Sequence, residues 1–165
     1  MARVDDGPVV ARIFAFLAQI GIGVVESDLP STFLPGVGIR GGCLHVDRSR
    51  LLWPGDLLHE AGHIAVTPER SRSTLDGEVA AEVAPHAGEV EATAWAWAAL
   101  LALGLPAEVL FHPGGYRGHS AGLIRTFSLG VYPGAAGLAA AGMTSLRRDH
   151  RGAPPYPHML HWLRR

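Results

Sequence analysis

The segment Leu57-Leu58-His59-Glu60-Ala61-Gly62-His63-Ile64 decides how the rest of this chain is interpreted. His59 and His63 are four residues apart, so on an α-helix they lie on one face, about 40° from each other around the axis. Two imidazoles in that position can bind one cation. The apolar neighbours would bury the remainder of the helix in a core. The segment therefore predicts a helix over about residues 55–66 that carries a metal site.

Glu60 stands between the two histidines and cannot point in their direction. The pattern His-Glu-x-x-His is typical of zinc hydrolases, in which the glutamate is a general base acting on a zinc-bound water. The pattern also occurs by chance on surface helices, but the apolar flanks and the carboxylates downstream favour a site. We therefore predict Zn²⁺ as cofactor, His59 and His63 as ligands, and Glu60 as catalytic base.

A catalytic zinc ion usually has three protein ligands and one open position. Residues 89–103 contain strong helix formers with apolar residues on nearly every side, so they predict a buried helix. A carboxylate at the start of such a helix needs a partner, and zinc is a suitable one. We predict Glu91 as the third ligand, with Glu89 and His86 as alternatives.

The two ligand-bearing segments resemble those of a known family. His59-Glu60-Ala61-Gly62-His63 followed by Glu91-Ala92-Thr93-Ala94-Trp95-Ala96 is similar to the ImmA/IrrE family of zinc metallopeptidases, which are compact bacterial and phage zincins. The resemblance covers about residues 8–105. Thr93 and Trp95 replace the asparagine and phenylalanine that are usual in the family. It implies a gluzincin-like site with Glu91 as ligand, and a protein substrate such as a transcriptional repressor.

The periodicity of the chain predicts an α+β fold. We expect a helix over 8–20, strands over 22–26 and 43–47, and loops over 28–42 and 67–77. Beyond Pro106 we expect short helices, at 107–111, 120–129 and 135–146, and then a short amphipathic helix or a loose tail over 154–165. The whole chain, 1–165, is predicted to be one zincin-like domain, with its core at about 8–105 and a helical extension at about 106–165.

The turn-rich segment 112–119 carries polar groups that could reach the site. A tetrahedral oxyanion needs a hydrogen-bond donor in addition to the metal. We predict Tyr116 and His119 as catalytic residues in that role, and His112 is a third candidate from the same loop.

Composition restricts the partners. The net charge is −1, which gives no global electrostatic case for nucleic acid. A nucleic-acid role would depend only on arginines near the end of the chain, and such charges are usually solvated surface: Arg147, Arg148, Arg151, Arg164 and Arg165. The apolar stretch 9–25 is too short and too polar for a membrane span and lacks a signal-peptide cleavage site. We therefore predict a cytoplasmic protein with no membrane partner.

The single cysteine, Cys43, excludes an intramolecular disulfide and a cysteine-based zinc finger. The expected function is that of a zinc-dependent endopeptidase acting on a protein substrate. The alternative is a binding or regulatory module of zincin fold, in which zinc is structural and proteolysis is absent or negligible. Glu60 favours the enzyme, since a purely structural site needs no general base.

Overall fold

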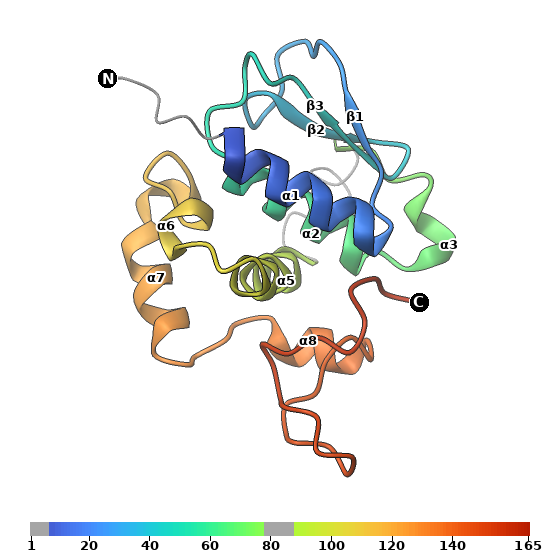
Figure 1. Cartoon of the computed structure of the whole chain (residues 1–165), viewed down its shortest axis with the longest axis vertical. Helices are drawn as coiled ribbons and strands as arrows, with labels where there is room; N and C mark the ends of the chain where they lie inside the picture. The colour runs from blue at the N-terminus through green and yellow to red at the C-terminus, as the bar shows by residue number, and fades with distance from the viewer. Residues whose placement is uncertain (1–6, 78–87) are drawn as a thin grey trace.

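The computed structural model describes residues 7–77 and 88–165, which form an α+β fold (Figure 1). The elements of these residues are, in order, α1 (Gly7–Ile20), β1 (Val24–Glu26), β2 (Val37–Arg40), β3 (Cys43–Val46), α2 (Gly55–Val66), α3 (Glu69–Arg72), α5 (Glu89–Ala102), α6 (Ala107–Leu110), the 3₁₀ turn η1 (Tyr116–Gly118), α7 (Ser120–Ser128) and α8 (Ala135–Ala140). The strands come early in the chain, and the part after α5 is helical or irregular.

The small sheet has the strand order β1-β3-β2. β1 runs parallel to β3, with Val24 opposite Leu44, and β2 runs antiparallel to β3, with Ile39 opposite Leu44. Strand β2 lies in the segment 28–42 that was predicted to be a loop, so that prediction is wrong there. Val37 and Ile39 are buried on one face of β2, where they form part of the core against which α2 packs.

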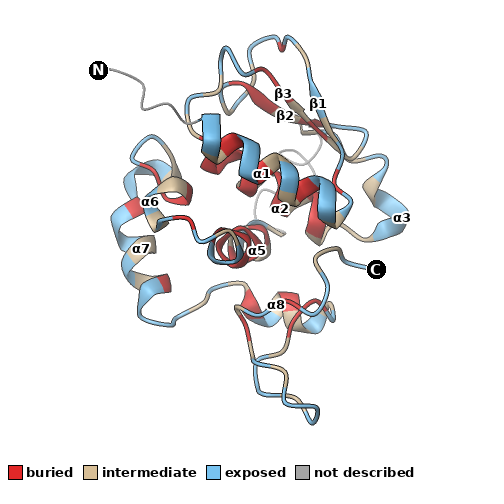
Figure 2. Ribbon diagram, in the orientation of Figure 1, coloured by how far each residue is buried: buried red, intermediate tan, exposed pale blue. Residues whose placement is uncertain are grey.

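Helix α5 lies at the centre of the molecule. Figure 1 shows it nearly end-on, between α2 on one side and α8 on the other, and both helices contact it. Figure 2 shows α5 as buried around most of its circumference, which confirms the prediction of a buried helix. Alanines separate the bulky side chains Trp95 and Trp97, so neighbouring helices can approach the backbone closely. No helix of the described residues is long and apolar enough to cross a membrane.

The contact between α2 and α5 is close because residue 62 is a glycine. A Cβ atom at Gly62 would lie only 2.5 Å from the carbonyl oxygen of Ala92, a distance that real Cβ contacts do not show. Since Ala92 lies about one helical turn after Glu89, the same contact fixes the first turn of α5 relative to the two histidines of α2. Gly62 therefore positions the two helices that carry the predicted site.

The last part of the chain packs on the core without forming a helix. Residues 154–165 consist of turns and irregular segments, so of the two predicted alternatives the amphipathic helix is absent, and the tail is packed on the core and not loose. Helix α8 ends at Ala140, before the predicted position 146. The segment is held by long-range hydrogen bonds. The Tyr156 hydroxyl donates to the Ala94 carbonyl at 2.8 Å, and the Trp95 indole donates to the Trp162 carbonyl at 2.9 Å.

Candidate metal centre

Three side chains from α2 and α5 converge at one point. The Nε2 atoms of His59 and His63 are 3.2 Å apart. Each lies 3.2 Å from a carboxylate oxygen of Glu89, His59 from Oε1 and His63 from Oε2. The histidines are mostly buried, whereas the Glu89 side chain is 49% exposed, so the group is open to solvent on the side of Glu89. These four atoms form a small ring of nitrogen and oxygen donors.

The dimensions of this ring fit a zinc ion. Ligand atoms that lie roughly 2.0–2.1 Å from zinc in tetrahedral geometry are about 3.3 Å from each other. The three separations between the histidine nitrogens and the Glu89 carboxylate are all 3.2 Å. Nitrogen from neutral imidazole and oxygen from carboxylate are also the donor types that zinc accepts. His59, His63 and Glu89 could therefore hold one zinc ion and leave its fourth position free.

Glu91, the predicted third ligand, is not part of this group. Two residues along a helix correspond to a rotation of about 200°, so Glu89 and Glu91 point to nearly opposite sides of α5. Glu91 packs against α8, where a Cβ atom at Gly137 would lie 2.6 Å from its Cγ. Of the two carboxylates, the structure brings Glu89, the alternative candidate, to the two histidines. His86, the other alternative, lies outside the described residues.

Glu60 lies beside the two histidines. His59, Glu60 and His63 offer ligand atoms that are all within 4.8 Å of one another. Burial raises the pKa of the Glu60 carboxyl, and this effect outweighs the opposing influence of the two imidazoles. A carboxylate with a raised pKa next to a metal position is suited to accept a proton and pass it on.

The ionisation of the metal-free group follows from its contacts. Hydrogen bonds from His59 and His63 hold the pKa of Glu89 well below its usual range, although burial opposes them. Burial alone would lower the pKa of His59, but the hydrogen bond to Glu89 and the nearby carboxylates raise it overall. Glu89 is therefore ionised, and its charge favours the protonated form of His59. A cation that binds here must displace that proton, which makes metal binding dependent on pH.

Tyr116 is the predicted catalytic residue that the structure brings to this group. Its ring packs edge-on against the His59 ring, with 5.8 Å between the ring centres, and in the same way against Phe111 at 5.1 Å. Burial raises the pKa of the Tyr116 phenol, and the carboxylates of Asp56, Glu89 and Glu60 raise it further. The phenol therefore stays protonated and can donate a hydrogen bond.

The other two candidates from the loop lie elsewhere. His119 is exposed at the start of α7, and within the described residues no side-chain contact joins it to the metal group. His112 is only 2% exposed, and its Nε2 pairs with Asp56 at 2.8 Å. A sealed imidazole cannot reach a substrate. The sequence did not indicate this buried pair, because 56 positions separate its two members.

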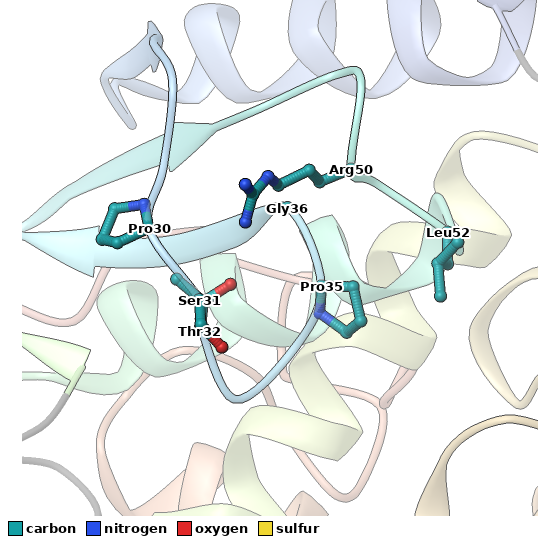
Figure 3. Close-up of a pocket in the computed structure, with 7 residues that line it drawn as sticks. All are labelled: Pro30, Ser31, Thr32, Pro35, Gly36, Arg50 and Leu52. Atoms are coloured by element: carbon teal, nitrogen blue, oxygen red, sulfur yellow. The ribbon is translucent and has the colours of Figure 1, made fainter.

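The hollows on the surface lie away from the metal group. Figure 3 shows one of about 350 Å³, where the Arg50 side chain lies near Gly36; it is lined by Pro30, Ser31, Thr32, Pro35, Gly36, Arg50 and Leu52. A second hollow of about 580 Å³ lies between α1, α3 and the last residues of the chain. Neither hollow includes His59, His63 or Glu89. The chemistry of the group therefore depends on its own donor atoms.

Comparisons with known proteins add no further information. No family model matches the chain, and no curated protein or solved structure matches it either. The resemblance to the ImmA/IrrE family rests on the residues of the two motifs and stays a prediction.

Proposed function

We propose that this protein is a zinc-dependent hydrolase of peptide bonds, with His59, His63 and Glu89 as zinc ligands. The observation that carries the proposal is the set of three equal separations of 3.2 Å between the two Nε2 atoms and the Glu89 carboxylate. Each separation matches the edge of a zinc tetrahedron, although the two histidines contact different oxygens of Glu89. One carboxylate oxygen would take the third corner and leave the fourth for a water molecule or a substrate.

Two features favour catalysis over simple metal storage. When bound, zinc would lower the pKa of a water molecule to about 7 and would polarise a carbonyl group. Glu60 lies where it can accept the proton of that water and deliver it to the leaving amine. In the metal-free protein burial raises the pKa of this carboxyl, which favours uptake of a proton.

Tyr116 supplies the second part of the chemistry. A phenol that stays protonated beside the His59 ring can donate a hydrogen bond to the oxygen that becomes negative as water attacks the carbonyl. Within the loop 112–119, Tyr116 is the residue whose side chain contacts a proposed ligand. Of the three residues that were candidates for stabilising the oxyanion, we therefore assign this role to Tyr116 and not to His112 or His119.

The substrate class follows from the resemblance and not from the geometry. A zincin of this kind would cleave a protein, and a transcriptional regulator is the candidate that the ImmA/IrrE resemblance supplies. A cytoplasmic location belongs to the same proposal.

One observation favours a second candidate function. The hollows of about 350 and 580 Å³ lie away from the metal group, and none of the three proposed ligands lines either of them. This favours a binding or regulatory module in which zinc joins α2 to α5 and hydrolysis is absent. The two functions differ in what Glu60 does, because a structural zinc site has no use for a base.

The test combines metal analysis with a cleavage assay. We expect about one zinc ion per chain, lost in His59→Ala and in His63→Ala. The zinc-loaded protein is then incubated with a peptide library derived from a bacterial proteome, and new N-termini are identified by mass spectrometry. Glu60→Gln is the matched control, since it should retain zinc and fold.

The outcomes separate the two functions. New N-termini that appear with the wild-type protein and disappear with Glu60→Gln support the hydrolase. A wild-type protein that binds one zinc ion but generates no termini beyond those of Glu60→Gln supports the binding module. A chain without zinc would contradict both.

A further inference from the structure

Asp56 in the first turn of α2 forms a buried pair with His112 in the loop that carries Tyr116. Asp56 Oδ1 and His112 Nε2 are 2.8 Å apart, and the two side chains are only 7% and 2% exposed. The other ring nitrogen of His112, Nδ1, is also buried and has no hydrogen-bond partner among the described residues. Asp56 is therefore the polar contact that sets the orientation of this ring.

The surroundings fit the His112 ring closely. The indole of Trp53 stacks on it, with 4.6 Å between the ring centres and an angle of 6° between the planes. On another side the backbone approaches so closely that a Cβ atom at Gly115 would lie 2.9 Å from Cε1 of the ring. The main chain is held too, because the Ser120 hydroxyl donates to the His112 carbonyl at 2.6 Å. The ring is thus a fixed anchor for the start of the loop.

This anchor lies four residues before Tyr116, whose ring centre is 6.3 Å from that of His112. Tyr116 and Arg117 have φ angles of 54° and 52°. Residues other than glycine seldom adopt this left-handed backbone conformation. Such a conformation persists only where surrounding contacts enforce it. The pair of Asp56 and His112 precedes this strained turn as a buried polar contact, and the Ser120 hydroxyl on the His112 carbonyl joins the two ends of the loop.

We propose that Asp56 and His112 are positioning residues that hold the loop 112–119 so that the Tyr116 phenol faces the metal group. They touch neither the metal nor the substrate and act through Tyr116. This inference rests on the proposed function, because it assigns a purpose to the phenol only if His59, His63 and Glu89 bind a metal.

A purely structural role is the rival explanation. A buried pair of this kind often adds little to stability compared with apolar residues of the same size, so stability alone does not explain its presence. The two explanations differ in one measurable respect. A positioning role requires that the effect of disturbing His112 vanish once the Tyr116 hydroxyl has been removed, whereas a structural role has no such dependence.

The experiment uses the full chain loaded with Co²⁺ in place of zinc, and acetohydroxamate as a probe that binds a metal through its oxygens. Affinity is measured from the change in the visible absorption of cobalt. We compare wild type, Tyr116→Phe, His112→Leu, His112→Gln and the double variant of Tyr116→Phe with His112→Leu. Gln can donate its amide to Asp56 as the imidazole does, and Leu cannot.

We expect Tyr116→Phe to weaken acetohydroxamate binding about tenfold, the scale of one hydrogen bond to a charged group. His112→Leu should weaken it by a similar factor, and the double variant should be no weaker than the weaker single variant. His112→Gln should stay within about twofold of wild type. Tyr156→Phe is the matched control, because it removes a buried phenol hydrogen bond to the Ala94 carbonyl that involves neither the proposed ligands nor the loop 112–119, and it should leave affinity unchanged.

A second variant covers the case in which His112→Leu does not fold. Gly115→Ala adds one methyl group against the His112 ring and leaves the Asp56 carboxylate in place. It should weaken acetohydroxamate binding severalfold in the wild-type background and have no effect in the Tyr116→Phe background.

The inference is overturned if His112→Leu, or Gly115→Ala in its place, leaves affinity unchanged, or if its effect multiplies with that of Tyr116→Phe. Failure of the proposed function has a different signature. A protein that shows no cobalt absorption dependent on His59, or that binds cobalt but no acetohydroxamate, contradicts the hydrolase proposal itself and the inference with it.

Discussion

Helix α2 carries two clusters of histidine and carboxylate that differ in composition and exposure. At its first turn Asp56 pairs with His112, and both side chains are sealed in the core. One turn later His59 and His63 meet Glu89, whose side chain is 49% exposed. The sealed cluster matches one imidazole with one carboxylate. The open cluster brings together two imidazoles and one carboxylate, with a second carboxylate, Glu60, close by.

The difference shows how one residue type serves two purposes on one helix. In the sealed cluster one imidazole nitrogen pairs with one carboxylate oxygen, and burial excludes a ligand. In the open cluster three donor groups face one point with separations that suit a cation, and one side remains accessible. We therefore interpret the open cluster as the metal centre and the sealed cluster as a support for the nearby loop.

The largest expected effect is a loss of zinc affinity that occurs for variants of the open cluster and not for a variant of the sealed cluster. His59→Ala and His63→Ala should each weaken zinc binding about a thousandfold, because roughly 10–16 kcal/mol of binding free energy is shared by a few ligands. His112→Gln should bind zinc as wild type does. Titration with a competing chelator measures all three. Equal losses in the three variants would remove the distinction between the clusters.

The next effect distinguishes the two carboxylates of α5. Glu89→Gln should weaken zinc binding about a hundredfold through loss of a charged ligand, on the order of the 1.5–3 kcal/mol of a charged contact. Glu91→Gln should stay close to wild type, since its side chain lies against Gly137 of α8. The same competition titration applies. The opposite ranking of these two variants would restore Glu91 as the ligand.

A third effect concerns the helix contact that forms the open cluster. Gly62→Ala should destabilise the protein by about 1–3 kcal/mol, because the new methyl group overlaps the Ala92 carbonyl. Gly122→Ala is the matched control in α7, where a Cβ atom meets nothing within 4 Å, and it should stabilise by up to about 1 kcal/mol. Urea unfolding measures both. If Gly62→Ala unfolds like the control, the two helices are not in the close contact described above.

The smallest effect is a pH dependence in the metal-free protein. The pKa of Glu60 is raised by burial, so the folded state binds more protons than the unfolded state as pH rises above about 4.5. The stability that depends on protonated Glu60 is present below that pH and is lost as pH rises through the folded-state pKa.

Glu60→Gln removes the carboxyl whose ionisation lowers the stability of the folded protein as pH rises. The variant should therefore be more stable than wild type at pH 7, and the difference should shrink towards zero near pH 4. Urea unfolding of both proteins without metal over this range gives the measurement. A difference in the free energy of unfolding that grows as pH falls would show that the Glu60 pKa is shifted in the other direction.

Much of this arrangement follows from local sequence signals. Apolar patterns, helix-forming residues and the positions of glycine and proline predicted α1, α2, α5, α6 and α7 close to their observed bounds, and the spacing of His59 and His63 predicted a shared face. Strand β2 was missed because it lies in a segment interrupted by glycine and proline, whereas β3, which has the same length, does not. Such turn-forming residues favour a loop and hide the alternation of Val37 and Ile39.

The choice between Glu89 and Glu91 could not be made in the same way. Helix α5 is apolar on nearly every side, so it has no amphipathic face that would show which carboxylate points towards α2. The Gly62–Ala92 contact decides the orientation, and Ala92 shares a face with Glu89. In hindsight, the small residues Gly62 and Ala92 are the signal in the sequence. The pairing of Asp56 with His112 has no such signal, because it depends on the path of the loop.

The most direct test of the metal centre is a crystal structure of the zinc-loaded protein. We predict zinc roughly 2.0–2.2 Å from Nε2 of His59, Nε2 of His63 and a Glu89 oxygen, with a water molecule at the fourth position. Glu91 should remain beside Gly137, and the pair of Asp56 and His112 should be free of metal. Zinc bound through Glu91, zinc bound at Asp56 and His112, or no metal between His59 and His63 would contradict the assignment.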